Sequence, residues 1–389
     1  MLRARLVLAS ILACLCPTAP GAARGDYTLT TLASFHGTTG ANPLGGLAID
    51  PAGNLYGTTY GGGAAGHGTA FRIDARTRAL ATIATFTGTN GAYPAAALTL
   101  DPKGNLYGTT SEGGAHGVGT AFRIDAHSGA LATIATFNGA NGSRPRAGLT
   151  IDAVGNLYGT TSGGGAKGQG TAFRIDARSG ALATIATFNG ANGALPLAGL
   201  TLDALGNLYG TTYAGGAKYR GTAFRIDANT RALTTLVTFN GLNGANPAAG
   251  LTIDPAGNLY GTTQYGGVNY AGTAFRIDAR SGALTTLASF SYSNANGINP
   301  TAPLTLDAQG NLYGTTPGNG EVDLGKVFRI DAITGALTIL ASIVGPNGIA
   351  PAGGLTIDAA GNLYGATISG GAFGQGTVFE LVYHRGPHG

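Results

Sequence analysis

The feature that most constrains this chain is a six-residue segment, Asn-Leu-Tyr-Gly-Thr-Thr, first found at residues 54–59. The segment or a close variant returns six times, spaced by 51 residues except for one interval of 53 residues. The tyrosines of the seven copies are Tyr56, Tyr107, Tyr158, Tyr209, Tyr260, Tyr313 and Tyr364. A fixed period of this length indicates a repeat architecture, in which each unit packs against its neighbours.

Each unit has the pattern of four short strands. In the second unit, strands are predicted over 97–101, 105–110, 120–125 and 130–137. These runs are rich in β-branched and aromatic residues and are bounded by Gly, Pro, Asn and Asp, which is typical of strands and turns. Tight turns join the first strand to the second and the third to the fourth, whereas a glycine-rich loop over 111–119 joins the second to the third.

Seven units of four strands are typical of a β-propeller. Residues 27–35 have the pattern of a fourth strand with no first three before it, and residues 378–382 have that of a third strand with no fourth after it. We therefore predict an all-β, seven-bladed propeller of four-stranded blades, closed by an N-terminal strand that completes the last blade. Joining these strands would cover an edge that is otherwise free to pair with other chains.

The predicted domains are a signal peptide over 1–23, the propeller over 24–384 and a short tail over 385–389. The signal is indicated by a basic start, an apolar run over 6–15 and small residues up to Ala23. We expect a secreted, extracellular or cell-surface protein, with the periplasm as a further option.

A lipoprotein signal, with Cys14 as the lipidated residue, is the alternative to simple secretion. Cys14 and Cys16 are the only cysteines of the chain. Both lie inside the predicted signal, so no disulfide is expected in the mature protein.

The charge of the chain is small. Its formal net charge is +4, and it falls to +2 once Arg3 and Arg5 are removed with the signal. A nucleic-acid-binding domain has a strong basic footprint, so no nucleic-acid partner is expected. We expect a monomer with no transmembrane segment in the mature chain, whose partner is an extracellular glycan or protein.

The repeated motif also resembles a known family. The run Leu-Tyr-Gly-Thr-Thr, two residues, Gly-Gly, four residues and Gly-Thr-x-Phe is similar to the GloVer-type tandem repeat of secreted and surface bacterial proteins. The resemblance extends from about residue 44 to residue 382. The first two strands of each unit are also similar to the NHL-type propeller blade. The resemblance implies a β-propeller outside the cytoplasm and assigns no catalytic residue.

The residues that repeat in every unit are interpreted as structural. The aspartates that end the first and third strands, such as Asp50 and Asp74, are expected to form turns rather than a metal or acid–base ring. The motif tyrosines are expected to pack between blades with bonded hydroxyls, and Gly57 to leave room for the next sheet. Arg72 and its equivalents are expected to pair with neighbouring blades.

No metal site or cofactor is predicted. Residues 61–66 and 163–168 match the G-x-G-x-x-G pattern, but a strand follows each of them. A dinucleotide site would need a helix at that place.

The residues that differ between units are the candidates for function. They lie in the loops between second and third strands and in the connections between blades, and these share one face of a propeller. Variable loops on a rigid scaffold commonly carry binding. Exposed Tyr, Asn and basic side chains suit glycans or peptides. The predicted ligand-binding residues are Tyr60, Tyr213, Tyr219, Tyr265, Tyr270, Lys167, Lys218 and Arg220. Tyr93, Arg144, Arg146, Asn138 and Asn141 are expected on the same face.

The leading function is therefore a secreted, non-catalytic binding or scaffold protein. The alternative is an extracellular propeller lyase or hydrolase that acts on a polysaccharide. Its candidate catalytic residues are His67, His116 and Glu112, where Glu112 would orient His116 and a tyrosine would donate a proton. Sequence drift in the loops, without any selection for binding, is a further interpretation.

Overall fold

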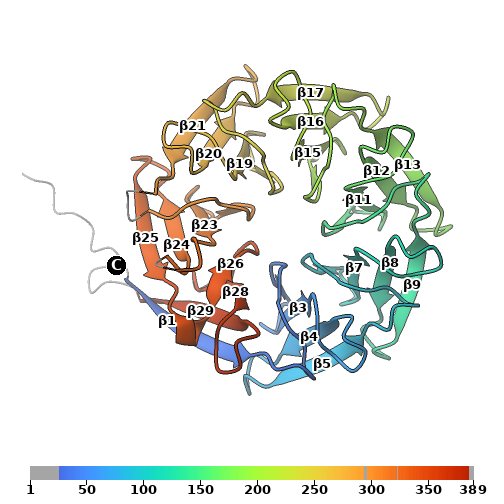
Figure 1. The fold of residues 1–389 in the computed structure, drawn as a ribbon, viewed down its shortest axis with the longest axis vertical. Helices are drawn as coiled ribbons and strands as arrows, with labels where there is room; N and C mark the ends of the chain where they lie inside the picture. Colours follow the sequence, from blue (N-terminus) through green and yellow to red (C-terminus); the bar gives the residue numbers. More distant parts are fainter. Residues whose placement is uncertain (1–25, 293–295, 322, 385–389) are drawn as a thin grey trace, which may run out of the picture.

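The computed structural model describes residues 26–292, 296–321 and 323–384, and it forms a ring of seven antiparallel sheets around a central opening (Figure 1). The predicted signal peptide and the tail over 385–389 lie outside these residues. The first strand of each blade is only two residues long and is the innermost, whereas the fourth is the outermost.

Blades 1 to 3 are β2(Ala48–Ile49), β3(Leu55–Thr59), β4(Thr69–Ile73) and β5(Leu80–Thr85); β6(Thr99–Leu100), β7(Leu106–Thr110), β8(Thr120–Ile124) and β9(Leu131–Thr136); β10(Thr150–Ile151), β11(Leu157–Thr161), β12(Thr171–Ile175) and β13(Leu182–Thr187). Blades 4 to 6 are β14(Thr201–Leu202), β15(Leu208–Thr212), β16(Thr222–Ile226) and β17(Leu233–Thr238); β18(Thr252–Ile253), β19(Leu259–Thr263), β20(Thr273–Ile277) and β21(Leu284–Ser289); β22(Thr305–Leu306), β23(Leu312–Thr316), β24(Lys326–Ile330) and β25(Leu337–Ser342).

Blade 7 is assembled from both ends of the described chain, as predicted. Its inner strands are β27(Thr356–Ile357) and β28(Leu363–Ser369), followed by β29(Thr377–His384). Its outermost strand is β1(Asp26–Ser34), which pairs antiparallel with β29 from Asp26↔His384 to Ser34↔Thr377. A short extra strand, β26(Ile349–Pro351), also pairs with β28, after a 3₁₀ turn over Gly345–Asn347. The two chain segments therefore close the ring in one sheet, and this closes a strand edge.

Phenylalanine pairs join neighbouring blades. Phe35, which follows the outer strand of blade 7, contacts Phe71 of blade 1 edge-on, with ring centroids 4.9 Å apart. The same contact recurs around the ring as far as Phe290 and Phe328, at 5.1 Å. At the last boundary Ile343 packs in the cluster of Phe379 instead. Each edge-to-face pair contributes about 0.5–1.5 kcal/mol beyond its buried area.

The small residue after each motif tyrosine has a different role from the one predicted. A Cβ on Gly57 would lie 2.6 Å from Cζ of Phe71, its cross-strand partner in the same sheet. Gly57 therefore leaves room for the phenylalanine of its own blade, and the expectation that it admits the next sheet is wrong. Within the described residues, no helix is long and apolar enough to cross a membrane.

Candidate functional site

The propeller has two faces of different character. The turn face carries the tight turns, such as Asp50–Asn54 and Asp74–Ala79, with their equivalents in the other blades. The loop face carries the loops between second and third strands, such as 60–68, together with the linkers between blades, such as 87–94. Isolated bridges between a linker and a loop, for example Ala92 with Glu112, confirm that these two kinds of segment share one face.

Repeated polar contacts hold the turn face together. In blade 1, Oδ1 of Asp50 accepts the N–H groups of Ala52 and Asn54, each at 2.9 Å. Its Oδ2 accepts Nδ2 of Asn54 at 2.7 Å and the Tyr56 hydroxyl at 3.0 Å. Burial alone would raise the pKa of the Asp50 carboxyl, but the hydrogen bonds from Asn54 and Tyr56 outweigh it and hold the pKa below its ordinary value. The predicted turn role of these aspartates is confirmed.

The repeated arginines pair within their own blade. Nη2 of Arg72 donates to Oδ1 of Asn54 and to Oδ2 of Asp74, each at 2.8 Å. Residues two apart on a strand face the same side of the sheet, so Asp74 is within reach without any neighbouring blade. The prediction that these arginines pair across blades is wrong, and the same contacts recur at Arg123, Arg174, Arg225, Arg276 and Arg329.

The seam breaks this pattern. Glu380 stands where the other blades have arginine, and its buried carboxylate accepts the Tyr364 hydroxyl at 2.9 Å. The partner cation is Arg78 of blade 1, at 3.2 Å. The blade boundary at the seam is therefore joined by an ion pair between blades 7 and 1.

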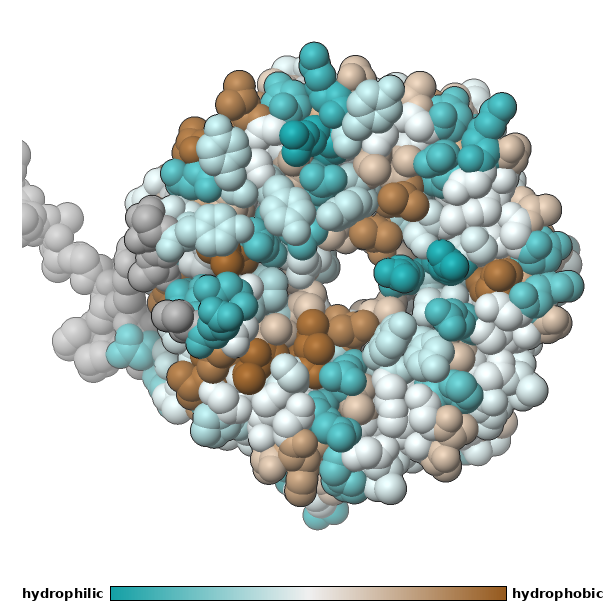
Figure 2. Space-filling model, viewed as in Figure 1, coloured by the Kyte–Doolittle hydropathy of each residue, from teal (hydrophilic) through white to brown (hydrophobic). Residues whose placement is uncertain are grey.

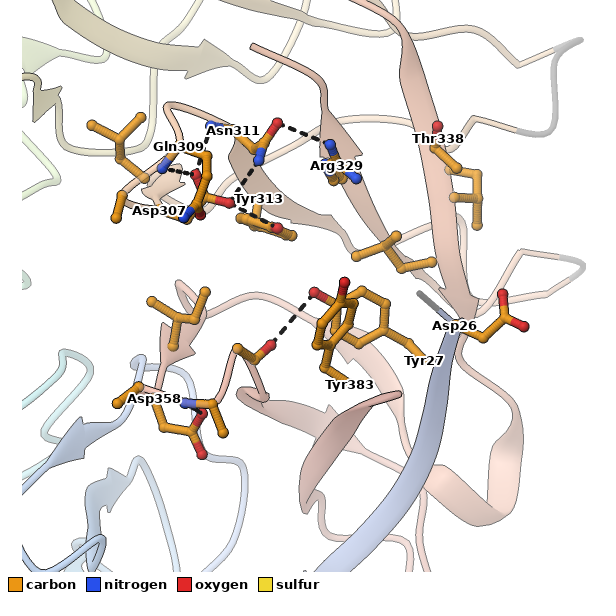
Figure 3. Close-up of a pocket in the computed structure, with 18 residues that line it drawn as sticks. Asp26, Tyr27, Asp307, Gln309, Asn311, Tyr313, Arg329, Thr338, Asp358 and Tyr383 are labelled. Carbon is orange, nitrogen blue, oxygen red and sulfur yellow. Dashed lines mark hydrogen bonds between the residues drawn. The ribbon is translucent and has the colours of Figure 1, made fainter. Parts of the chain in front are cut away.

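A cleft of about 660 Å³ opens between blades 6 and 7 on the turn face (Figure 3). Tyr27 of β1 and Tyr383 of β29 line it, with ring centroids 5.2 Å apart. Its Asp307 is already bonded, because the carboxylate accepts hydrogen bonds from Gln309, Asn311 and Tyr313, whereas the buried Nε of Arg329 has no partner within the described residues. We interpret this cleft as a structural consequence of closure and not as the functional site.

A ring of strained residues marks the loop face. Each linker places one non-glycine residue in the left-handed region, with φ between 53° and 59°, immediately before a proline. The N–H group of each residue donates to a loop carbonyl of the preceding blade, as Tyr93 does to His67 at 2.9 Å. These seven residues are Asn42, Tyr93, Arg144, Leu195, Asn246, Asn299 and Ala350. The docking of the linkers therefore places seven side chains of five kinds at the blade boundaries.

The boundary of blades 1 and 2 holds an aromatic cluster. Tyr60 stacks on Tyr93 with ring centroids 5.0 Å apart and planes 25° apart. The ring of His67 meets Tyr93 edge-on at 5.5 Å. All three side chains are half-buried, and the buried Nδ1 of His67 has no hydrogen-bond partner within the described residues. This cluster offers a flat aromatic surface beside an imidazole.

A second group of tyrosines lies at the boundary of blades 4 and 5. Burial, and then the neighbouring Tyr265, raise the pKa of the Tyr213 hydroxyl. Nδ2 of Asn246 donates to the Tyr213 carbonyl at 3.0 Å, and the Asn246 N–H donates to the Arg220 carbonyl at 2.7 Å. Tyr219 and Tyr270 are exposed by 80% and 72%. Of the predicted ligand-binding tyrosines, the structure thus brings Tyr213 and Tyr265 together.

The basic side chains of the loop face are exposed, and no ion pair involves them in the part of the chain that the structure describes. They are Lys167, Lys218, Arg220, Arg144 and Arg146. Arg146 also lines the central channel. The loop asparagines differ, because Oδ1 of Asn138 accepts the backbone N–H of Asn141 and Oδ1 of Asn141 accepts that of Asn138. These side-chain oxygens stabilise their own loop.

The three residues of the catalytic alternative remain a prediction. His67 belongs to the aromatic cluster, whereas His116 and Glu112 are exposed on the loop of blade 2. Glu112 occupies the repeat position of Tyr265, and its backbone bridges to Ala92 of the linker that also carries Tyr93. Among the described residues, no group of three or more His, Cys, Asp and Glu side chains is placed to hold a metal ion.

Residues 22–204 and 200–379 match the Gloeobacter/Verrucomicrobia repeat. The chain belongs to this family. No curated protein matches it significantly. The family assignment agrees with the seven-bladed ring and with the repeated Asn-Leu-Tyr-Gly-Thr-Thr segment that predicted it.

Solved structures share the fold at low identity. The extracellular domain of a putative hybrid two-component system from B. thetaiotaomicron is 15% identical with a TM-score of 0.60, covering 93% of this chain and 43% of that one. A fungal alcohol oxidase of the AA5 family, in complex with copper, is 14% identical with a TM-score of 0.61, covering 93% and 76%. A putative 6-phosphogluconolactonase from Bacteroides fragilis is 20% identical with a TM-score of 0.53, covering 81% and 86%. These likenesses show the fold alone, since one fold hosts many functions.

Proposed function

We propose that this protein is an extracellular binding or scaffold protein without catalytic activity, and that its loop face takes a glycan. One observation carries the proposal. The longest segments that differ between blades lie on the loop face, where they include a stacked tyrosine pair and unpaired cations. The turn face repeats one network in which the polar groups bind each other. A peptide is the other ligand that this surface suits.

The aromatic cluster supports a glycan in particular. Tyr60 and Tyr93 present amphipathic rings whose conformational freedom is already restricted by stacking. A sugar ring can place its C–H face on such a surface while its hydroxyls meet amides and hydroxyls at the rim. The extracellular setting of a similar propeller is consistent with secretion, which the predicted signal peptide also indicates.

The first experiment is a glycan array with the purified protein, followed by affinity measurements on the best oligosaccharide. Tyr60→Ala and Tyr93→Ala are expected to weaken binding by about 3- to 10-fold each, as for the loss of an aromatic contact. The matched control is Leu205→Ala, an apolar side chain exposed by 81% on the turn face. Binding that is lost with Leu205→Ala and kept with the tyrosine variants would contradict the proposal.

The second candidate is a lyase or hydrolase that acts on an extracellular polysaccharide. It is favoured by His67, whose buried Nδ1 has no partner in the described chain and whose ring touches Tyr93. An imidazole in this position could move a proton. Release of new reducing or unsaturated ends by the wild type, and their disappearance in His67→Gln with binding retained, would favour catalysis over simple binding.

A further inference from the structure

The central channel differs from the rest of the surface in its lining. The inner segments of the seven blades surround a cavity of about 390 Å³. The residue after each linker proline lies at the loop-face end, and these residues are Leu44, Ala95, Arg146, Leu197, Ala248, Thr301 and Ala352. Arg146 is the one charged side chain among the described residues that line the channel. Six apolar or small neighbours thus leave a single guanidinium at the mouth.

Threonine hydroxyls bind part of the backbone of the channel wall. The Thr58 hydroxyl of blade 1 donates to the Ala96 carbonyl of blade 2 at 2.9 Å, and the Thr99 hydroxyl donates to the Leu149 carbonyl of the next blade. The first contact recurs from Thr109, Thr160, Thr211, Thr262 and Thr315, and the second from Thr150, Thr201, Thr252, Thr305 and Thr356. Threonine hydroxyls therefore occupy two carbonyls of most blades.

The N–H groups of the same wall are not occupied. Within the described chain, no N–H donates a hydrogen bond from the three residues that follow each linker proline, for example 95–97 and 146–148. The carbonyls beside each bound one, such as those of Ala95 and Ala97, accept no hydrogen bond from the described residues either, so the backbone of the wall by itself favours neither charge. The guanidinium of Arg146 is what favours an anion at this place.

A second arginine lies two residues away. Arg144 is one of the seven strained linker residues, with φ of 54°, and its N–H donates to the Val118 carbonyl at 2.8 Å. Both arginines are exposed, and neither forms an ion pair with a described acid. Figure 2 shows hydrophilic surface reaching the central opening across from the hydrophobic surface over blade 7. Arg146, the one charged side chain among the described residues that line the channel, lies just before blade 3, so the mouth is positive on that side.

We propose that Arg144 and Arg146 form an anion site at the mouth of the channel, and that this site takes the carboxylate or sulfate group of an acidic saccharide. The inference rests on the proposed glycan-binding function and specifies its ligand class. The aromatic cluster of Tyr60 and Tyr93 lies at the adjacent blade boundary, so one chain of sugars can stack there and place its acidic group on the arginines. Guanidinium groups bind carboxylate and sulfate through paired hydrogen bonds.

The test uses one oligosaccharide in two forms: hexagalacturonate and its fully methyl-esterified, uncharged counterpart. Titration calorimetry on the wild type is expected to show tighter binding of the acid by on the order of tenfold, the low end for a hydrogen bond to a charged group. Arg144→Gln with Arg146→Gln should abolish this preference and keep binding of the ester. The control Arg178→Gln, an exposed arginine of the turn face, should keep the preference.

Equal binding of acid and ester by the wild type, or a preference that survives in the double variant, would overturn the anion site while leaving the glycan function intact.

If neither form binds, the anion site is tested by the effect of inorganic sulfate on the melting temperature. At constant ionic strength, sulfate in place of chloride should raise the melting temperature of the wild type by more than that of the double variant. An equal rise in both proteins rejects the anion site. Tighter binding of a single-stranded oligonucleotide than of hexagalacturonate would also reject it, because the site would then serve a nucleic acid.

Discussion

The two faces of this propeller differ in how uniform their side chains are from blade to blade. On the turn face, aspartate, asparagine, tyrosine and arginine recur in nearly every blade and hydrogen-bond one another within the blade. On the loop face, the loop side chains differ from blade to blade, and each linker holds one non-glycine residue in a left-handed conformation, whereas on the turn face only Arg78 and Arg231 of the described residues do so.

The contrast between the two faces indicates which residues stabilise the fold and which are available for binding. Satisfied polar networks stabilise a fold, since a buried group without a partner costs about 1–3 kcal/mol. Left-handed backbone in a non-glycine residue costs on the order of 1 kcal/mol, and strain of this kind accumulates at functional sites. We therefore expect the turn face to respond to mutation in stability and the loop face to respond in binding.

Acid should produce the largest effect, and it should act through the turn face. Hydrogen bonds lower the pKa of eleven aspartates there: Asp50, Asp74, Asp101, Asp125, Asp152, Asp176, Asp203, Asp227, Asp254, Asp278 and Asp331. A carboxyl whose pKa is lower in the folded state contributes stability above its unfolded pKa, about 3.9, and loses it as the pH falls toward the folded value.

The melting temperature is thus expected to be constant above about pH 5 and to fall steeply below pH 4. Circular dichroism melts between pH 2.5 and pH 7 measure it. Glu112→Gln, on the loop face, should leave the profile unchanged. A melting temperature that stays flat down to pH 3 would contradict the role given to the aspartates.

The next largest effect should come from one asparagine. Nδ2 of Asn156 donates to Asp152 at 2.7 Å, and its Oδ1 accepts Nη2 of Arg174 at 2.7 Å and the N–H of Ala177 at 3.0 Å. Asn156→Ala leaves all three partners short of a hydrogen bond, so the free energy of unfolding should fall by about 2–4 kcal/mol. Urea denaturation measures the change.

The control for this variant is the same substitution on the loop face. Asn141→Ala removes bonds to Asn138 and to the Thr136 carbonyl, which solvent can partly replace. Its cost should stay below about 1 kcal/mol. If the two substitutions cost the same, the contrast between the faces is wrong.

The seam gives a smaller and more selective effect. Arg78 and Arg231 occupy the same turn position in blades 1 and 4, each with φ of 59°. Arg78 meets the buried Glu380, whereas the corresponding side chain opposite Arg231 is Arg174. Arg78→Gln should lower the free energy of unfolding by about 1–2 kcal/mol, because it leaves a buried carboxylate without its cation while solvent screens part of the loss. Arg231→Gln should change it by less than about 0.5 kcal/mol, as measured by urea denaturation.

Sequence reasoning predicted most of the fold for a simple physical reason. The strands, the turns and the closure of the ring depend on short patterns that recur in all seven units, such as Asp50 followed by Asn54 and Tyr56. A prediction made for one unit is therefore supported by the other six. The partner of Arg72 and the role of Gly57 were predicted wrongly. Both depend on which side of a twisted sheet each side chain faces. The period of the repeat does not tell whether that side contacts the same blade or the next one.

The candidate site was predicted less completely than the fold. The loop face and its tyrosines followed from the variation between blades, but the pairing of Tyr60 with Tyr93 follows from the docking of a linker on two different loops. Arg146 was one of several basic residues until the structure placed it in the channel. Aligning the residues that follow each linker proline would have singled it out, since it is the one charged residue at that position.

The smallest effect should come from relief of strain in the linker ring, and it should have the opposite sign. Leu195 is 40% exposed with φ of 54°. Leu195→Gly removes a left-handed non-glycine residue, a gain of about 1–2 kcal/mol, and loses about 0.5–1 kcal/mol to the greater freedom of glycine in the unfolded chain. The free energy of unfolding should rise by about 0.5 kcal/mol.

Tyr93→Gly is the comparison variant. The lost stacking on Tyr60 offsets the gain from relieved strain, so the free energy of unfolding should stay unchanged while glycan binding falls. Urea denaturation and calorimetry on the two variants separate these outcomes, and a marked destabilisation by Leu195→Gly would show that this linker side chain holds the fold and is not available to a ligand.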